Sequence, residues 1–356
     1  MILSRTPFRV TLGGGGTDLP SYYRKHGGFL VAMGLDKYMY VAINPPIVGR
    51  HVRVVYTKSE TVAHPDQLLH ELAREALKRH GIYSQMEVAS MADLPAGTGL
   101  GSSSCYLVGL LAALRAYRRN HCSMQELAEE ACDIELNVLK KAIGKQDQFM
   151  AAFGGMTVLE IGKDGKVAVR AAKLNAASLA DFIANTHMYY TGVRRSAPDI
   201  LKDQDAAMKS EQAASHEVVQ GALHSIKEIG YQVLDAVEKE NYDDFGKLMD
   251  DHWQHKKRMS AKIAIPGIDE LYREVKQRFG VLGGKVSGAG GGGFFMVYAP
   301  KQHSELNGFM EAHGLRRMHY GLEFEGAKII SNSAVFSSGF LEHAPIPVEE
   351  RASVGS

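Results

Sequence analysis

Short apolar runs rich in β-branched and aromatic residues dominate the first 60 positions of the chain. We predict strands over FRVTL, FLVAMGLDKYMYVAI and VRVVYT, with a Pro-Pro turn at residues 45–46 before the third. Residues 68–79 carry apolar side chains at helical spacing, which predicts a helix that ends before Gly81. MEVASM predicts a further strand, and the apolar segment 105–117 predicts a buried helix.

Grouped strands and grouped helices follow in the rest of the chain. We predict an amphipathic helix over 124–140, a loop over 144–155, and a hairpin formed by MTVLEI and KVAVRAA. Further strands are expected at THMYYTG, KVSG, FFMVYA and AKIISNS, and further helices over 206–229, 232–257 and 268–279. This grouping favours an α+β fold over a doubly wound parallel sheet.

The length of 356 residues predicts two domains or two lobes. We place them at 1–183 and 184–337, followed by a tail at 338–356 that has no periodicity.

Composition excludes several classes of protein. The 41 Lys and Arg residues nearly balance the 40 Asp and Glu residues, so no overall charge favours nucleic acid or an anionic membrane. Three cysteines without a C-x-x-C pair give no disulfide framework. The first residues lack the apolar core of a signal peptide, and the segment 105–114 is shorter than the roughly 20 residues that span a bilayer. We therefore expect a cytoplasmic protein with small-molecule partners, no nucleic acid and no membrane.

Glycine is the unusual residue, because 14 of the 37 glycines fall in three clusters. The central cluster is Gly97-Thr98-Gly99-Leu100-Gly101, followed by Ser102, Ser103 and Ser104 at the start of the apolar helix. Glycines bring backbone N–H groups close to an oxyanion, and the helix dipole adds positive potential. No lysine follows the last glycine, so the segment is not a Walker A loop. A flexible loop with a serine cap is the alternative.

PAGTGLGSSS resembles the phosphate-binding motif of the GHMP small-molecule kinases. RTPFRV leading to Thr17-Asp18 is similar to the first motif of that family, and KVSGAGGGGF is similar to the third. The resemblance covers roughly residues 2–335. It implies a two-lobed α+β fold, with an N-terminal lobe like ribosomal protein S5, a ferredoxin-like C-terminal lobe, and the active site between them. It also implies a kinase that uses ATP and Mg²⁺.

The resemblance implies roles for several residues. Gly97, Gly99, Leu100, Gly101 and Ser102 to Ser104 would bind the ATP phosphates, and Ser103 with Glu135 would hold the metal. Asp147 in GKQDQFMAAFGG matches the catalytic aspartate, and Arg9 matches the arginine that faces it and would stabilise the transferring phosphoryl group. The alternatives are an ion pair of Glu135 with Lys140 or Lys141, and a purely structural pair of Arg9 with Asp147.

The first glycine cluster bears on the acceptor. Asp18 matches a sugar-binding aspartate, and Gly15-Gly16 stand where galactokinases carry Glu-His. We interpret Gly13 to Gly16 as room for a longer, phosphorylated sugar, with a plain tight turn as the alternative. Gly14, Gly15, Gly16 and Thr17 are the expected substrate-binding residues beside Asp18. Candidate cations for its phosphate are Arg24, Lys25, Arg194 and Arg195, since arginine suits phosphate, with solvated surface charge as the alternative. Gly290 and Gly291 would line the cleft from the third cluster.

Within the family, SRTPFRVTLGGGGTDLPSYYRKHGG, DHWQHKKRMS and LGGKVSGAGGGGFF are most similar to the sugar kinases that act on the anomeric hydroxyl of a heptose 7-phosphate. Fucokinase-type or galactokinase-type activity, or a non-catalytic sugar-phosphate sensor, are the alternatives. On the helix with DHWQHKK, we interpret His252, Lys256 and Lys257 as a solvated basic face, with substrate contact as the alternative. We interpret Trp253 as a packing residue, with stacking on adenine or a sugar as the alternative. A monomer or a homodimer is expected.

Overall fold

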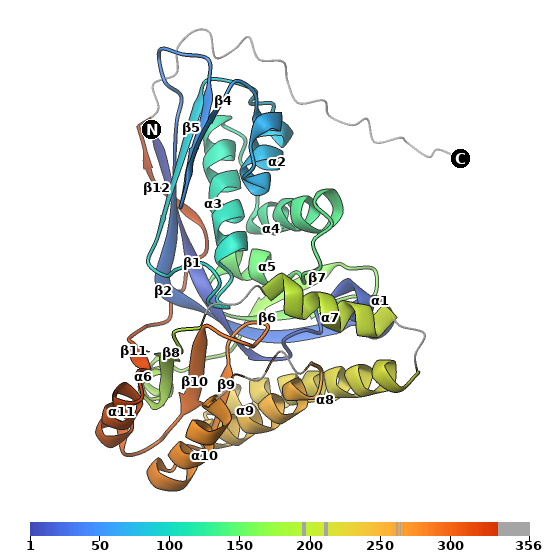
Figure 1. Ribbon diagram of the computed structural model, residues 1–356, viewed down its shortest axis with the longest axis vertical. Coiled ribbons are helices and arrows are strands. Elements are labelled where there is room, and N and C mark those ends of the chain that lie inside the picture. The colour runs from blue at the N-terminus through green and yellow to red at the C-terminus, as the bar shows by residue number, and fades with distance from the viewer. Residues whose placement is uncertain (194–196, 210–212, 261–262, 264, 266, 334–356) are drawn as a thin grey trace.

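The larger of two β-sheets contains strands from both ends of the chain. The computed structural model describes residues 1–193, 197–209, 213–260, 263, 265 and 267–333. Within these residues, eight strands form the larger sheet, with a path β12-β1-β2-β5-β3-β4 and with β6 and β7 attached to β2 (Figure 1). The strands are β1 (Ile2–Gly13), β2 (Gly28–Asn44), β3 (Val52–Val55), β4 (Ser59–Val62), β5 (Met86–Ala92), β6 (Met156–Ile161), β7 (Val167–Ala171) and β12 (Lys328–Asn332).

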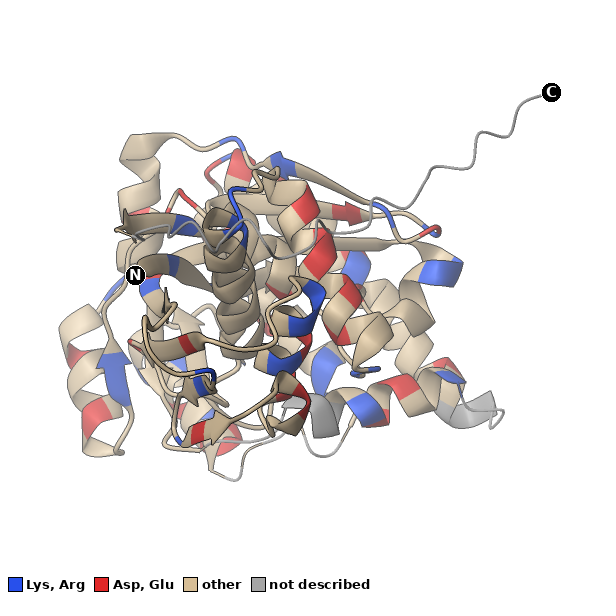
Figure 2. Cartoon of the chain, turned by 90° about the horizontal axis from the view of Figure 1, so that it is seen from above, with Lys and Arg blue, Asp and Glu red and all other residues tan. Residues whose placement is uncertain are grey.

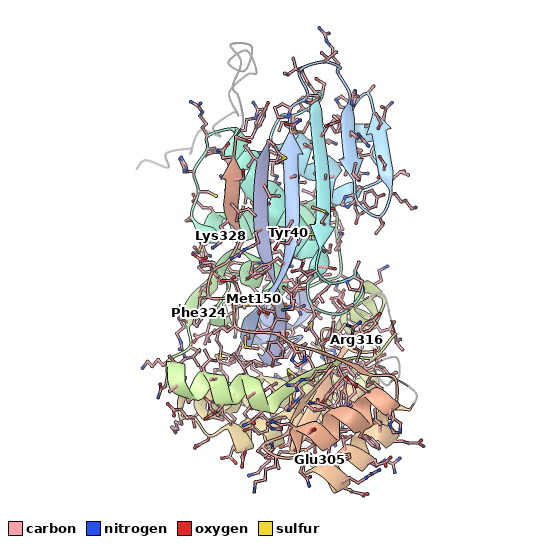
Figure 3. All side chains as sticks on the ribbon, turned by 90° about the vertical axis from the view of Figure 1, so that its left-hand side faces the viewer. Tyr40, Met150, Glu305, Arg316, Phe324 and Lys328 are labelled. Carbon is pink, nitrogen blue, oxygen red and sulfur yellow. The ribbon has the colours of Figure 1, made fainter. Side chains whose placement is uncertain are left out.

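Helices cover one face of this sheet, as Figure 1 shows. They are α2 (Glu71–Arg79), α3 (Ser102–Tyr117), α4 (Met124–Cys132) and α5 (Gln146–Phe153). Helix α3 is apolar along most of its length and packs on β1 and β2, where it buries residues such as Leu107 and Leu111. Figure 3 looks onto the other face of the sheet, where Tyr40 of β2 and Lys328 of β12 are labelled.

The smaller sheet has the order β11-β8-β10-β9 and belongs to the second half of the chain. Its strands are β8 (Thr186–Tyr190), β9 (Gly283–Val286), β10 (Phe294–Tyr298) and β11 (Arg316–Met318). The helices of this half are α6 (Ala176–Asn185), α7 (Ala197–Lys209), α8 (Ala213–Glu238), α9 (Tyr242–Lys257), α10 (Ile268–Phe279) and α11 (His303–Ala312). Mixed helices and strands around two hydrophobic clusters confirm the α+β prediction.

Strand β12 shows that the chain does not divide simply into two consecutive halves. After β11 in the smaller sheet, the chain returns and β12 pairs antiparallel with β1, with Ile2 opposite Asn332. The predicted boundary at residue 183 stays a prediction, but the last strand lies in the sheet of the first half. The tail 338–356 lies outside the described residues. No helix within the described part of the chain combines the length and apolar character that a membrane span requires.

Several predicted elements differ from the structure. The predicted loop 144–155 contains α5, a helix of two turns whose first residue, Gln146, donates its backbone N–H to the distant Asp18 carboxylate. The predicted helix 124–140 is α4 followed by a π-helical turn, η2 (Asp133–Val138). We predict a break between the helices 206–229 and 232–257, but α8 continues through Gly230 to Glu238. Gly230 packs against Gly14 at this point. Helices α6 and α11 were not predicted.

Candidate active site

A cavity of about 310 Å³ lies where the three glycine clusters meet. Helix α9 and strand β9 supply one side of it, and β1 with the starts of α3 and α5 supplies another. Its charged and polar side chains are Arg9, Thr11, Asp18, Ser102, Ser103, Ser104, Glu135, Lys141, Gln146, Asp147, Gln204, His252, Lys256, Lys285 and Ser287. The cavity therefore joins side chains that are up to 278 positions apart in the chain, from Arg9 to Ser287.

The central glycine cluster forms the tight entry to α3. Gly101 caps the helix in the left-handed region, with φ 84° and ψ 23°, which a residue with a Cβ adopts at a cost. Gly97, Gly99 and Gly101 line the cavity together with Ser102 to Ser104, so the helix N-terminus is open to it. Leu100 is instead buried in the core, where its backbone oxygen accepts a hydrogen bond from Arg9 N. This arrangement suits an anion.

The third glycine cluster packs directly on the central one. A Cβ on Gly288 would lie 2.6 Å from Gly99 Cα, and a Cβ on Gly293 would lie 2.0 Å from the backbone oxygen of Thr98. Gly288 lines the cavity. Gly290 and Gly291 contact Ile263 instead and are not among its lining residues, so their predicted substrate contact has no support in this arrangement.

Arg9 and Asp147 form a close ion pair inside the cavity. The Asp147 Oδ1 atom lies 2.5 Å from Arg9 Nη2 and 2.7 Å from Arg9 Nε. Arg9 Nη1 also donates to the backbone oxygen of Gly99 at 2.8 Å. The Asp147 side chain is 31% exposed, whereas that of Arg9 is 6% exposed, so the carboxylate can reach a ligand while the guanidinium is held in the wall. A Cβ on Gly101 would be 3.4 Å from the carboxylate, which places Asp147 over the start of α3.

Glu135 lies on the π-helical turn η2 and faces the serines of α3. Its Oε1 accepts from Ser103 Oγ at 3.3 Å, and its Oε2 accepts from Ser104 Oγ at 2.8 Å and from Gln148 Nε2 at 2.6 Å. Burial raises the pKa of this carboxyl, although Lys141, whose Nζ is 3.6 Å from Oε1, acts against the rise. The predicted alternative, an ion pair with Lys141, is thus present beside the contact with Ser103. π-Helical turns are frequent at functional sites.

The predicted metal ligands can be compared with this geometry. Among the described residues, no three His, Cys, Asp or Glu side chains form a metal cage. Ser103 and Glu135 together offer hydroxyl and carboxylate oxygens that face the cavity. Mg²⁺ prefers such hard ligands and takes its remaining ones from water and substrate phosphates. The two residues therefore fit Mg²⁺ held jointly with a phosphate ligand.

Asp18 connects the first glycine cluster to α5. Its Oδ2 accepts from Gln146 N at 3.0 Å, and its Oδ1 accepts from Gly16 N at 3.2 Å. Burial raises the pKa of this carboxyl, and the bond from the Gln146 backbone opposes the rise. Asp18 lines the cavity with Gly15 and Gly16.

Thr17 and Gly14 do not line the cavity. The Thr17 hydroxyl donates toward the backbone oxygens of Gly14 and Phe29 and accepts from Phe29 N, so it fixes the turn after β1. A Cβ on Gly14 would lie 1.9 Å from the Phe29 oxygen. Both residues hold the backbone of the turn, which is the structural alternative stated for this cluster.

The cations that the structure brings to the cavity differ from those predicted. Arg24 and Lys25 are exposed on α1 (Pro20–His26) and do not line it, because α1 turns their side chains to solvent. Arg194 and Arg195 lie outside the described residues. Lys256 and Lys285 line the cavity instead.

The predicted solvated basic face on α9 is wrong for two of its three residues. His252 is 1% exposed and Lys256 is 6% exposed, because α9 packs this face against β9. Lys257 pairs with Asp269 at 2.9 Å. The prediction for Trp253 is confirmed, since it is 1% exposed in the second hydrophobic cluster.

The sequence contains a signal that could have identified His252, Lys256 and Lys285 as buried residues. His252 and Lys256 are four positions apart and so lie on the same helix face as Phe245 and Met249, which are apolar. Lys285 interrupts a glycine-rich apolar strand, where an unpaired charge is costly.

The comparisons with known proteins agree with this geometry. The GHMP kinases N terminal domain matches residues 67–155, and the GHMP kinases C terminal domain matches residues 233–306. The D-glycero-alpha-D-manno-heptose 7-phosphate kinase of Campylobacter jejuni is 24% identical over 332 residues, which cover 88% of this chain and 94% of that protein. The L-fucokinase/L-fucose-1-P guanylyltransferase of Bacteroides fragilis is 24% identical over 84% of this chain, which spans 34% of that protein.

A solved structure shares the fold over nearly the whole chain. The crystal structure of a D-glycero-D-manno-heptose 1-phosphate kinase from Bacteroides thetaiotaomicron superposes with a TM-score of 0.75 at 22% identity, and covers 94% of this chain and 100% of the other. Both domains of one kinase family thus occur in order along this chain, and the predicted two-lobed kinase fold is confirmed. The protein belongs to the GHMP kinases.

Proposed function

We propose that the protein transfers the γ-phosphoryl group of ATP to the anomeric hydroxyl of D-glycero-D-manno-heptose 7-phosphate. The product would be heptose 1,7-bisphosphate, which serves the synthesis of nucleotide-activated heptose for cell-surface polysaccharide. The observation that carries the proposal is the Arg9–Asp147 pair beside the open N-terminus of α3. This pair provides a proton acceptor and a cation where a bound phosphate would present its terminal group.

The ATP phosphates would lie at the start of α3. Backbone N–H groups of the Gly97–Gly101 loop and the hydroxyls of Ser102 and Ser103 face the cavity there. Ser103 and Glu135 would hold Mg²⁺, which neutralises charge on the phosphates when it is bound. Lys141, which already neutralises part of the Glu135 charge, would face the same phosphates.

Asp147 would accept the proton of the acceptor hydroxyl, and Arg9 would stabilise charge on the phosphoryl group in transfer. The bond from Arg9 Nη1 to the Gly99 oxygen fixes the guanidinium to the phosphate loop. This bond keeps the cation and the carboxylate in register with the donor. A non-catalytic sensor would have no need of this arrangement.

A phosphorylated sugar is supported by the name of the Campylobacter jejuni relative, and Gly15 and Gly16 line the cavity where such a sugar would bind. Asp18 would bind a sugar hydroxyl from the same side of the cavity. Its burial and its bond from Gln146 N hold the carboxylate in one orientation. Because another relative is named an L-fucokinase, unphosphorylated L-fucose is the competing acceptor.

The test is the release of ADP from ATP and Mg²⁺ with a panel of acceptors. The panel contains heptose 7-phosphate, unphosphorylated heptose, L-fucose, galactose and mevalonate. We expect heptose 7-phosphate to give the highest kcat/KM. A higher kcat/KM with L-fucose or galactose would replace the proposed acceptor, and no turnover with any sugar would contradict the proposal.

A further inference from the structure

We propose that His252, Lys256 and Lys285 form a subsite that binds the phosphate group which the acceptor sugar already carries. The inference rests on the proposed function and assigns its substrate specificity to three residues outside the predicted site. The three side chains come from α9 and β9, two elements in contact, and all three line the cavity.

Burial distinguishes these three residues from surface cations. His252 is 1% exposed, Lys285 is 2% exposed and Lys256 is 6% exposed. Lys256 Nζ donates to the backbone oxygen of Gly288, and Lys285 Nζ donates to that of Leu12 at 2.7 Å. An ammonium has three N–H groups, so each lysine keeps donors for a ligand while its position is fixed.

The two lysines lack the partner that other charges in the cavity have. Asp147 pairs with Arg9, and Glu135 lies beside Lys141. No carboxylate in the described chain lies within 4.0 Å of the Lys256 or Lys285 ammonium group. Buried lysines are almost always paired, so an absent anion is the expected partner. Asp18 is near enough to raise the pKa of Lys256, but burial and Arg9 act against it.

His252 supplies a second, independent sign of a ligand. Neither of its ring nitrogens has a hydrogen-bond partner among the described residues, although the ring is buried and lines the cavity. A buried N–H left without an acceptor destabilises the folded state. A phosphate oxygen beside Lys256, one helical turn along α9, would satisfy it.

The position of the subsite favours the acceptor over ATP. The Leu12 oxygen that holds Lys285 directly precedes the Gly13–Gly16 run, and Asp18 lies near Lys256. Ser103 and Glu135, the proposed metal ligands, lie on α3 and η2 instead. The Gly288 oxygen that holds Lys256 is next to Gly99, however, so the terminal phosphate of ATP has the same chemistry and must be separated by experiment.

The experiment compares Lys256→Met and Lys285→Met with Lys257→Met. Lys257 is the next residue of the same helix, pairs with Asp269 and does not line the cavity, so it is the matched control. Steady-state KM values are measured for ATP, heptose 7-phosphate and unphosphorylated heptose, and melting curves confirm folding. We expect Lys256→Met and Lys285→Met each to raise the KM for heptose 7-phosphate about tenfold or more. The KM for ATP and the kcat/KM for unphosphorylated heptose should stay within about twofold.

A rise in the KM for ATP alone would assign the lysines to the nucleotide and overturn the inference, as would equal effects on both acceptors. His252→Asn is a further variant, which replaces one polar side chain by another and so differs from the lysine-to-methionine changes. Its KM for heptose 7-phosphate should also rise. If the wild-type protein turns over other sugars but not heptose 7-phosphate, the proposed acceptor fails and the subsite with it. If wild-type turnover is normal and the variants match Lys257→Met, only the subsite fails.

Discussion

The Nη2 atom of Arg9 lies 2.5 Å from Oδ1 of Asp147, and the same guanidinium donates to the Gly99 oxygen of the phosphate loop. One buried side chain on β1 thereby fixes both the loop before α3 and the carboxylate at the start of α5. The loop before α3 and the Asp147 carboxylate cannot move independently while this contact holds. Residues 138 positions apart in sequence are thus coupled in a single unit.

Asp147→Asn should remove most phosphoryl transfer and leave the fold intact. The amide keeps the shape of the side chain but cannot accept the proton, and general base catalysis contributes about 10²–10⁴-fold. We expect kcat to fall by at least about 100-fold while ATP still binds. Calorimetric titration with ATP and a thermal melt are the controls. Turnover near that of the wild type would assign Asp147 a structural role only.

Glu135→Gln should raise the Mg²⁺ concentration needed for half-maximal velocity. Residues that only contact a metal ligand already change the metal affinity by about 10–100-fold. For a direct ligand we therefore expect the required Mg²⁺ concentration to rise more than about tenfold. Glu71→Gln is the matched control, because Glu71 also pairs with Lys141, at 2.9 Å, but does not line the cavity. An unchanged Mg²⁺ requirement in Glu135→Gln would remove this residue from the metal site.

The kcat/KM for the acceptor should fall as the pH rises above about 8. Burial lowers the pKa of Lys256 to about 8, with Arg9 adding to the effect and Asp18 opposing it. Above this pH the free enzyme loses the Lys256 proton, and with it a positive charge that attracts phosphate. The sugar phosphate stays a dianion in this range, because its second pKa is about 6. Lys285 and His252 face the same cavity, and burial lowers the pKa of both side chains as well. The alkaline fall should be absent in Lys256→Met.

The close contact between α8 and β1 can be tested by alanine substitutions at two glycines of α8. A Cβ on Gly230 would lie 3.1 Å from both Gly14 Cα and Phe29 Cδ1, whereas a Cβ on Gly221 would meet nothing within 4 Å. Alanine in a helix is favoured over glycine by about 0.5–1 kcal/mol, so Gly221→Ala should raise the melting temperature. Gly230→Ala should be less stable than Gly221→Ala. Equal melting temperatures would show that the helix shifts without cost.

Local patterns in the sequence predicted most strands, the apolar helix α3 and the three glycine clusters. These features depend on side-chain periodicity and on glycine, which act within a few residues. Helix α5 was missed because its first turn is bonded by Asp18, a residue 128 positions away. The pairing of β12 with β1 was also not foreseen, since it depends on the return of the chain after β11.

The candidate site shows the same difference between features that local sequence patterns reveal and features that depend on distant contacts. Arg9 with Asp147, and Ser103 with Glu135, were named from motifs and are brought together by the structure. Arg24 and Lys25 were named as cations of the site but do not line the cavity, because SYYRKHGG marks charged residues in sequence but not their exposure on α1. Lys256 and Lys285 are buried by the packing of α9 on β9, which no local pattern states.

The central claim is that this kinase phosphorylates the anomeric hydroxyl of a sugar that already carries a phosphate. Phosphorus NMR of the product formed from ATP and heptose 7-phosphate tests it most directly, with Asp147→Asn as the control. The account predicts two phosphorus signals from the sugar product, one of them from a phosphate on the anomeric oxygen, and no such signal with the variant. A product phosphorylated at any other position, or ADP release without a new sugar phosphate, would contradict it.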